Sequence, residues 1–558
     1  MAEIAAEGIE APARGAGLGT VVAASSLGAT FEWYDFFVFG SLTQVISKTF
    51  FSGLNETAGY IAALALFGAG FAFRPIGALA FGRIGDRVGR KGAFLVTVML
   101  MGGATVAIGL LPSYAMAGIA SPILLLLMRI LQGFALGGEY GGAAIYVAEH
   151  APTGARGRST SWVQTAAAFG LFAALLVILV TRLVLGRTFG PTAFDAWGWR
   201  IPFLFSAGLL AVSIFMRMKL TESPTFAAMK EEGGMSAAPY AEAFGQWKNL
   251  KLVLLALVAV MFAQGAVWYT AFFYAQTFME KFLKVDPATI NGLMMAVVAA
   301  SAPFYVFFGW LSDKVGRKPV MLFGMTLMLA AYFPGFHMLT QTLNPALAEA
   351  TAASPATVIA DPADCSLQFD PVGKAAFASS CDIAKSALAN AGVSYINEPA
   401  QPGQLAMVRV GMATIPSLDA RGLPKDVAKA IKVSIETKIK EGLARANYPA
   451  KADPKRMNLA GAFGVMLVFV VAATALFGPI AAFLVELFPT KIRYTALSLP
   501  YHIGTGWVGG FVPFTAFAIV ASVGNIYAGL WYPFAFTAVS VLTCLFLVPE
   551  TKGRSLSD

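Results

Sequence analysis

The sequence predicts an all-α integral membrane protein of twelve transmembrane helices in two six-helix bundles, with a small polar α+β insertion between helices 9 and 10. Three observations carry this prediction. The chain is 57% hydrophobic and 13% charged. Its uncharged runs recur at the length of about 20 residues that one bilayer crossing needs. Motifs in the first half return in the second half, which indicates an internal repeat.

Helices are expected where long apolar runs lie between short basic loops. In the first half these runs lie at about 20–47, 59–81, 92–112, 121–148, 160–186 and 200–217. In the second half they lie at about 250–279, 288–311, 319–341, 458–486, 494–521 and 526–548. The basic loops Gly82–Gly92 and Ser312–Lys318 follow the positive-inside pattern. Both loops, and therefore both termini, are expected in the cytoplasm.

The same runs predict the domains. The expected order is a cytoplasmic tail (1–19), the first bundle (20–218), a cytoplasmic linker (219–249), the second bundle (250–548) and a second cytoplasmic tail (549–558). The first residues lack a basic region followed by an apolar core, so no cleaved signal peptide is expected. The net charge of +9 lies largely in short loops and indicates topology rather than nucleic acid binding.

The repeat also locates an insertion. "GRIGDRVGRK" from Gly82 is matched by "GWLSDKVGRK" from Gly309, 227 residues later, whereas Glu149 and Glu486 correspond at an offset of 337. The difference of about 110 residues predicts a periplasmic insertion at 342–456, where the composition turns polar. An amphipathic helix is expected there at Asp426–Ala446.

The insertion contains two of the three cysteines. Cys365 and Cys381 have fifteen residues between them. In an oxidising periplasm they can form a disulfide, and the alternative is that both stay unpaired. No cysteine has a metal-ligand spacing, so no metal site is expected.

Several motifs together resemble the major facilitator superfamily. The superfamily motif is present at residues 82–91, with a weaker copy at 313–318. "FEWYDFFVFG", "FRPIGA", "RILQGFALGGEYGGA" and "LTESPTF" are similar to the metabolite:proton symporter family within it. This resemblance covers all twelve expected helices but not the insertion.

The resemblance implies a proton-coupled carrier of the bacterial inner membrane that can act as a monomer, with protons as the coupling ion and no other cofactor. Family members carry small organic acids, such as citrate, 2-oxoglutarate, shikimate or aromatic acids, or zwitterionic osmolytes, such as proline and betaine. It also implies that Asp86 pairs with basic groups and caps a helix, which locks the cytoplasmic side shut. The expected gating residues are Gly82, Asp86, Arg87, Arg90, Asp313 and Arg317.

Ionisable residues inside the membrane cost roughly 2.5–3.5 kcal/mol each on insertion scales and therefore indicate function. Glu32 and Asp35 in helix 1 and Glu139 in helix 4 are the candidates for proton coupling. Burial raises the pKa of such an acid and a nearby arginine lowers it, so the acid can bind and release a proton. Glu139 lies in the small-residue run "GGEYGG" and can equally serve packing and gating.

Arginine is the expected ligand for a substrate carboxylate, because guanidinium stays charged and offers two parallel hydrogen bonds. Arg129 in helix 4 and Arg74 in helix 2 are the candidates. The alternatives are a structural ion pair for Arg129 and a structural or snorkelling role for Arg74. His502 in helix 11 is a further candidate, although a core histidine is the more common case.

Helix 7 carries polar tips among aromatic residues in "FAQGAVWYTAFFYAQ". Gln264, Trp268 and Tyr269 recur at helical spacing and predict a pocket wall, the alternative being an ordinary packed core. Tyr34 and Tyr140 are expected to add hydroxyl donors to the substrate site.

Other chemistries find no support in the sequence. "GTGWVG" from Gly504 fits a dinucleotide pattern but lies within an apolar helix, where small residues allow close helix packing. No phosphate-binding loop for ATP occurs, and no nucleophile–base set indicates an enzyme.

The leading hypothesis is proton-coupled uptake of a small organic acid, a mono- or dicarboxylate that includes aromatic and shikimate-like acids, by alternating access. The second hypothesis is a proton symporter of zwitterionic osmolytes such as proline or betaine. A hypothesis from a different class is a transporter-like receptor that binds a solute without accumulating it.

Overall fold

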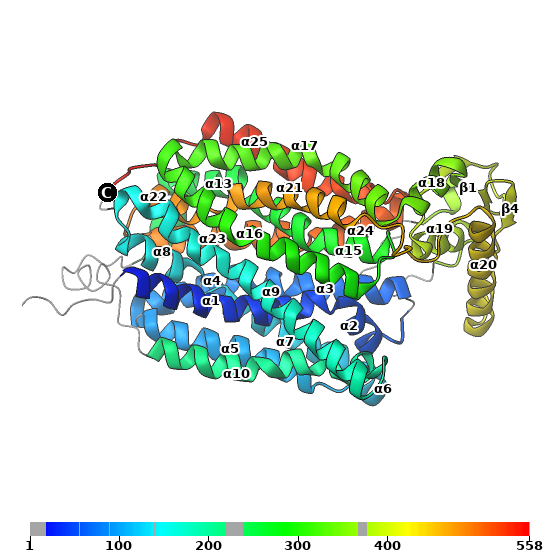
Figure 1. The fold of residues 1–558 in the computed structure, drawn as a ribbon, viewed down its shortest axis with the longest axis horizontal. Coiled ribbons are helices and arrows are strands. Elements are labelled where there is room, and N and C mark those ends of the chain that lie inside the picture. The colour runs from blue at the N-terminus through cyan, green and yellow to red at the C-terminus, as the bar shows by residue number, and fades with distance from the viewer. Residues whose placement is uncertain are drawn as a thin grey trace, which may run out of the picture.

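The computed structural model describes residues 18–54, 56–88, 90–138, 140–218, 238–366 and 377–556. Two helical bundles lie side by side, the first coloured blue to teal and the second green to red (Figure 1). A small unit projects from one end of the second bundle. We call that end the outer end and the opposite end, where α1 begins and the chain ends, the inner end.

Both bundles consist of helices in the order that the apolar runs predict. The first contains α1 (Leu18–Ser41), α2 (Thr43–Phe50), α3 (Glu56–Ala72), α4 (Arg74–Val88), α5 (Arg90–Leu110), α6 (Tyr114–Ala117), α7 (Ala120–Leu136), α8 (Tyr140–His150), α9 (Arg156–Thr188) and α10 (Arg200–Met218). The second follows α12 (Pro239–Gly245) and contains α13 (Trp247–Ala256), α14 (Phe262–Tyr269), α15 (Ala275–Lys281), α16 (Pro287–Val315), α17 (Arg317–Leu343), α21 (Leu459–Phe477), α22 (Ile480–Leu487), α23 (Arg493–His502), α24 (Val512–Val523) and α25 (Trp531–Leu547).

The all-α membrane architecture predicted from the sequence is confirmed. Nine helical runs in the described part of the chain are long and apolar enough to cross a membrane. Two shorter apolar helices, Leu95–Leu110 and Arg200–Phe215, and α1 occupy the three remaining predicted positions. Whether the chain crosses the membrane at those three positions, and therefore the total of twelve crossings, stays a prediction. The domain boundaries stay predictions as well. Much of the expected linker, residues 219–237, lies outside the described residues.

Glycine and proline explain why several predicted helices consist of two pieces. α21 and α22 are separated by Gly478 and Pro479, because proline cannot donate the backbone hydrogen bond that continues a helix. Small residues also allow close helix packing. A Cβ atom on Gly133 of α7 would lie 1.7 Å from the carbonyl oxygen of Gly70 in α3. Only glycine fits this contact, which holds α3 against α7.

The insertion is a small α+β unit, as predicted. Its four strands are β1 (Ala356–Ala360), β2 (Tyr395–Pro399), β3 (Met407–Val410) and β4 (Ala413–Pro416), in the sheet order β2-β1-β3-β4. β1 and β2 are parallel and are connected through α19 (Ser380–Ala391), whereas the other pairs are antiparallel. Helix α18 (Pro345–Ala353) precedes the sheet, and α20 (Lys425–Arg445) lies where the amphipathic helix is expected.

Backbone hydrogen bonds attach the insertion to the outer end of the second bundle. The amide of Tyr395 donates to the carbonyl of Gly524 at 2.8 Å, and that of Ala452 donates to the carbonyl of Lys284 at 3.2 Å. Helix α19 contacts both α24 of the second bundle and α3 of the first. The insertion therefore covers part of the outer end where the two bundles meet.

A disulfide joins Cys365 to Cys381, whose Cα atoms lie 5.1 Å apart, which is the first of the two alternatives left open by the sequence. Reduction should destabilise the insertion by about 3 kcal/mol, the chain-entropy value for a closed loop of about 15 residues. We expect faster hydrogen exchange in α19 and β1 after reduction, with exchange in α16 and α17 unchanged. Unchanged exchange in α19 would contradict this role.

Candidate solute site between the bundles

The helix backbone is irregular at the level of the candidate site. In the run Trp247–Lys281, which is the helix 7 expected from the sequence, π-helical turns at Leu257–Met261 and Thr270–Tyr274 flank α14. Helix α14 carries Gln264, Trp268 and Tyr269. In the run Arg493–Val523, which is the helix 11 expected from the sequence, a π-helical segment at Ile503–Gly509 directly follows α23. Such irregular turns inside helices occur frequently at functional sites.

The π-helical segment of helix 11 also brings the two helices into close contact. A Cβ atom on Gly265 would lie 2.2 Å from the carbonyl oxygen of Gly504. The "GTGWVG" stretch therefore serves helix packing, as its apolar setting predicts.

Arg74 lies at the interface of the bundles and is 1% exposed. Its guanidinium carbon is 4.0 Å from the ring centre of Phe71, 4.6 Å from that of Phe36 and 5.5 Å from that of Trp33. Its Nε and Nη2 atoms have no hydrogen-bond partner within the described part of the chain. Aromatic faces thus hold the cation in place while two of its nitrogens stay available to a ligand.

Further buried polar atoms without partners lie around Arg74. Among the described residues they are the hydroxyls of Tyr269 and Tyr501 and both ring nitrogens of His502, with Oε1 of Gln264 in α14 likewise buried without a partner. The Tyr269 hydroxyl lies close enough to the Arg74 guanidinium to pair with it, and the His502 ring lies near the backbone of Gly137. Tyr269 and Tyr501 lie within electrostatic reach of the guanidinium, as does His502. Because buried polar groups normally have partners, this set indicates a place where water or a solute binds.

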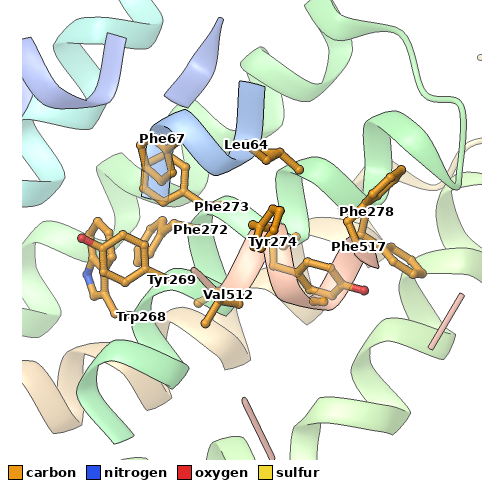
Figure 2. Close-up of a cluster of buried hydrophobic side chains, with 14 of the residues drawn as sticks. Leu64, Phe67, Trp268, Tyr269, Phe272, Phe273, Tyr274, Phe278, Val512 and Phe517 are labelled. Atoms are coloured by element: carbon orange, nitrogen blue, oxygen red, sulfur yellow. The ribbon is translucent and has the colours of Figure 1, made fainter. Parts of the chain in front are cut away.

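Aromatic residues from both bundles surround these polar atoms. The rings of Phe37 and Trp268 stack at 5.6 Å between centroids, and Phe67 lies 5.1 Å from Phe273. Figure 2 shows Phe67 beside Phe273, and Trp268 beside Tyr269. The indole Nε1 of Trp268 donates to the hydroxyl of Tyr305 at 2.7 Å, which fixes the ring. Helix 7 therefore contributes aromatic faces rather than a free indole donor.

Arg129 requires a correction, because its guanidinium is occupied within the first bundle. Nε and Nη2 donate to the carbonyls of Leu66 and Phe67 at 3.3 and 3.1 Å, and Nη1 donates to Oε1 of Gln132 at 2.6 Å. The alternative expected for Arg129, an ion pair with an acid, is not formed either, because all three nitrogens donate to uncharged oxygens. Arg129 connects α7 to α3, and of these two arginines Arg74 is the one with unpaired nitrogens.

Tyr34 of α1 is bonded within the first bundle, and the two acids of α1 are buried. The Tyr34 hydroxyl donates to the carbonyl of Pro202 in α10 at 2.7 Å, so it is not available to a substrate in this structure. Asp35 is buried, lies near Ser206 of α10, and its Oδ1 has no partner among the described residues. Glu32 is also buried. Glu139 lies outside the described residues.

Tyr140 connects the two bundles. Its ring stacks on that of Tyr501 with centroids 3.5 Å apart, and its hydroxyl accepts from Nε2 of Gln164 at 2.7 Å. The hydroxyl of Tyr494 donates to the carbonyl of Gly138 at 2.6 Å on the same side. Helices α8 and α23 are thus in direct contact below the polar cluster, toward the inner end.

An ion-pair cluster lies where the two bundles meet at the inner end, and two of the residues predicted to act in gating belong to it. The Asp313 carboxylate accepts from the amides of Gly157 and Arg158 at 2.9 and 2.8 Å and so caps α9 of the other bundle. Arg317 donates to Asp313 at 2.6 Å and to Glu486 at 3.0 Å. All three side chains of this ion-pair network are buried.

Two further ion pairs at the inner end reflect the internal repeat. Arg156 of α9 lies 3.8 Å from Glu486 of α22, and Arg493 of α23 lies 3.6 Å from Glu149 of α8. Each pair joins the two bundles, and both residues of the first pair correspond to those of the second at the repeat offset of 337. The offset alone could have identified this reciprocal arrangement.

The remaining gating residues were predicted from the loop after helix 2. The side chains of Gly82, Asp86, Arg87 and Arg90 lie outside the part of the chain whose side chains are described. Tyr501 was missed from the sequence because "LSLPYHIG" shows no polar spacing that distinguishes it from the surrounding apolar residues.

The sequence matches the family described as "Sugar (and other) transporter" over residues 20–237, 227–356 and 445–558. The chain belongs to this family of the major facilitator superfamily. This transporter also shares the fold of the proton:xylose symporter XylE in complex with 6-bromo-6-deoxy-D-glucose, at a TM-score of 0.62 and 16% identity over 97% of this chain and 98% of that one. The family consists of membrane transporters rather than enzymes.

Two relatives of this chain are transporters named for different substrates. The transporter is 33% identical over 335 residues to the glycine betaine/proline/ectoine/pipecolic acid transporter OusA of Dickeya dadantii, covering 58% of this chain and 65% of the relative. It is 36% identical over 330 residues to the citrate-proton symporter of Klebsiella pneumoniae, covering 59% of this chain and 72% of the relative. The match thus spans slightly less than two thirds of OusA.

Proposed function

We propose that this transporter takes up a small zwitterionic carboxylate of the betaine or proline class together with a proton, by alternating access. The observation that supports this proposal most strongly is the cluster of unpaired polar atoms around Arg74, which aromatic side chains surround. One guanidinium with free nitrogens suits one carboxylate. The rings of Trp33 and Trp268 are in tilted contact, with centroids 6.4 Å apart, and would separate to take a substituted ammonium group on their faces. This reverses the order of the two hypotheses drawn from the sequence.

An organic-acid substrate is the second candidate, favoured by the citrate-proton symporter relative. The geometry weighs against a di- or tricarboxylate. Arg129, the other buried arginine near the cluster, already has a partner at each of its guanidinium nitrogens. A second or third carboxylate would therefore lack a cationic partner in the described site, and desolvating it would be costly.

Proton coupling is assigned to Asp35, with Glu32 and Glu139 as the further candidates. The support is that Asp35 is buried with an unpartnered Oδ1. A carboxyl in such a site changes protonation with its surroundings. For the inner gate, the repeat suggests that Asp86 caps α23 as Asp313 caps α9, since the two acids are related by the offset of 227. Inner-membrane location, cytoplasmic termini and a monomeric carrier complete the proposal.

Uptake into proteoliposomes tests this function. We expect an inward proton gradient to drive accumulation of radiolabelled glycine betaine, and unlabelled proline to compete better than citrate. Asp35→Asn should abolish the dependence on the gradient while solute exchange between equal pH values persists. Accumulation of citrate but not of betaine would support the organic-acid candidate instead, and binding without any exchange would indicate a receptor.

A further inference from the structure

A groove of about 600 Å³ opens between α1 and α9 near the inner end of the first bundle. Its walls are largely apolar and include Leu27, Trp162 and Phe169, which are 49%, 43% and 43% exposed. Trp162 and Phe169 lie on a run long and apolar enough to cross a membrane, and Leu27 lies on α1, a crossing predicted from the sequence. The bilayer is therefore the medium expected to reach them. Gly19 keeps one side of the groove open, because a Cβ atom there would meet nothing within 4 Å.

A single cation lies at the inner rim of this groove. Arg158 in the first turn of α9 is exposed, and its guanidinium has no partner in the described ranges of the chain. No acidic residue is among the described residues that line the groove. Trp162, one turn further along α9, has the amphipathic ring that prefers the headgroup level of a bilayer.

We propose that this groove binds an anionic phospholipid of the inner leaflet. An acyl chain would occupy the apolar groove, and the headgroup phosphate would pair with Arg158. The support is the combination of a membrane-exposed apolar groove with an unpaired guanidinium at its interfacial end, the pattern by which basic pockets between helices hold anionic headgroups. The lipid is independent of the transported solute.

The position of the groove connects the lipid to the inner gate. The backbone amide of Arg158 donates to Asp313 at 2.8 Å, across the boundary between the bundles. A lipid that restrains Arg158 also restrains the first turn of α9 in the position that Asp313 caps. Anionic lipid therefore favours the state with a closed inner end, because a ligand stabilises the state to which it binds better.

Native mass spectrometry of the full-length chain tests the binding. Phosphatidylglycerol and phosphatidylcholine with the same acyl chains are compared, with glycerol 3-phosphate as the free-phosphate arm. We expect retention of phosphatidylglycerol alone, and about five-fold weaker retention in Arg158→Gln, the effect of one basic residue at a membrane surface. Arg158→Gln keeps the amide that Asp313 needs. The matched control is Arg187→Gln, an exposed arginine at the other end of α9.

A second variant tests the groove itself. Gly19→Leu places a side chain in this space, where an added Cβ atom would meet nothing within 4 Å, and should weaken retention of phosphatidylglycerol while leaving the melting temperature in detergent unchanged. Equal retention of both lipids, or equal effects of Arg158→Gln and Arg187→Gln, would overturn the proposal. So would a full-length chain that retains no lipid while a chain lacking residues 1–17 does, since the groove would then hold the chain's own N-terminal segment.

Discussion

Arg74→Gln is expected to reduce betaine uptake by a factor of about thirty to several thousand, the effect of removing one partner of a buried charge pair (about 2–5 kcal/mol). Two of the guanidinium nitrogens have no hydrogen-bond partner among the described residues, so the resting protein loses mainly the contacts of Arg74 with the rings of Phe36 and Phe71. The melting temperature without solute should therefore fall less than it does in Arg129→Gln. The measurement is initial uptake in proteoliposomes together with a thermal melt of the same preparation.

Arg129→Gln is the matched comparison, because Arg129 is equally buried but fully hydrogen-bonded. It should lower the melting temperature, since the carbonyls of Leu66 and Phe67 would lose their partners. Arg74→Lys should retain only a small part of the uptake, because an ammonium cannot form the two parallel bonds of a guanidinium. If Arg129→Gln abolished uptake without a loss of stability while Arg74→Gln transported normally, the two roles would be the reverse of those assigned.

Arg317→Gln is expected to open the inner end. It leaves Asp313 buried without its cation and Glu486 with only the longer pair to Arg156, at a cost of about 3–5 kcal/mol for a broken buried ion pair. Because both acids belong to the contact between the bundles, separating the bundles relieves this cost. The population should therefore shift toward a state open to the inner side.

The rate of maleimide labelling measures this shift. Ser498 of α23 faces Gly141 of α8 across the closed contact, and Cys544 is a buried free thiol. In a Cys544→Ser background, Ser498→Cys should label at least about ten times faster when Arg317→Gln is present, a gain equivalent to about 1.4 kcal/mol. The control is Arg409→Gln in the insertion, whose pair with Glu398 is exposed and contributes little. Equal labelling in the two variants would contradict the assignment of a gate.

The positions of the helices could be predicted from the sequence because bilayer thickness sets a length that apolar runs must match. The sheet of the insertion could not. Its central strands β1 and β3 are separated by almost fifty residues, and pairing over such a distance leaves no local pattern. The position of the insertion was predictable, because the jump in the repeat offset is independent of its fold.

The types of residue in the candidate site could be predicted from the sequence, but the hydrogen-bond partners of each side chain could not. Arg74 and Arg129 both lie in apolar helices, and the sequence does not show that only Arg129 meets backbone carbonyls of a neighbouring helix. Likewise, Tyr34 and Trp33 are adjacent in sequence, yet one is directed to α10 and the other to Arg74. These differences depend on helix rotation, which sequence spacing constrains only within one helix.

Isothermal titration of the purified protein with glycine betaine and 3,3-dimethylbutyrate tests the central claim most directly, because the two ligands have the same shape and carboxylate and differ only in the positive charge. The proposed site predicts that betaine binds about thirty-fold more tightly, the effect of a desolvated cation on aromatic faces (about 2 kcal/mol). It also predicts that Arg74→Gln weakens the binding of both. Equal binding of the two ligands, or betaine binding that survives Arg74→Gln, would contradict a zwitterion site around Arg74.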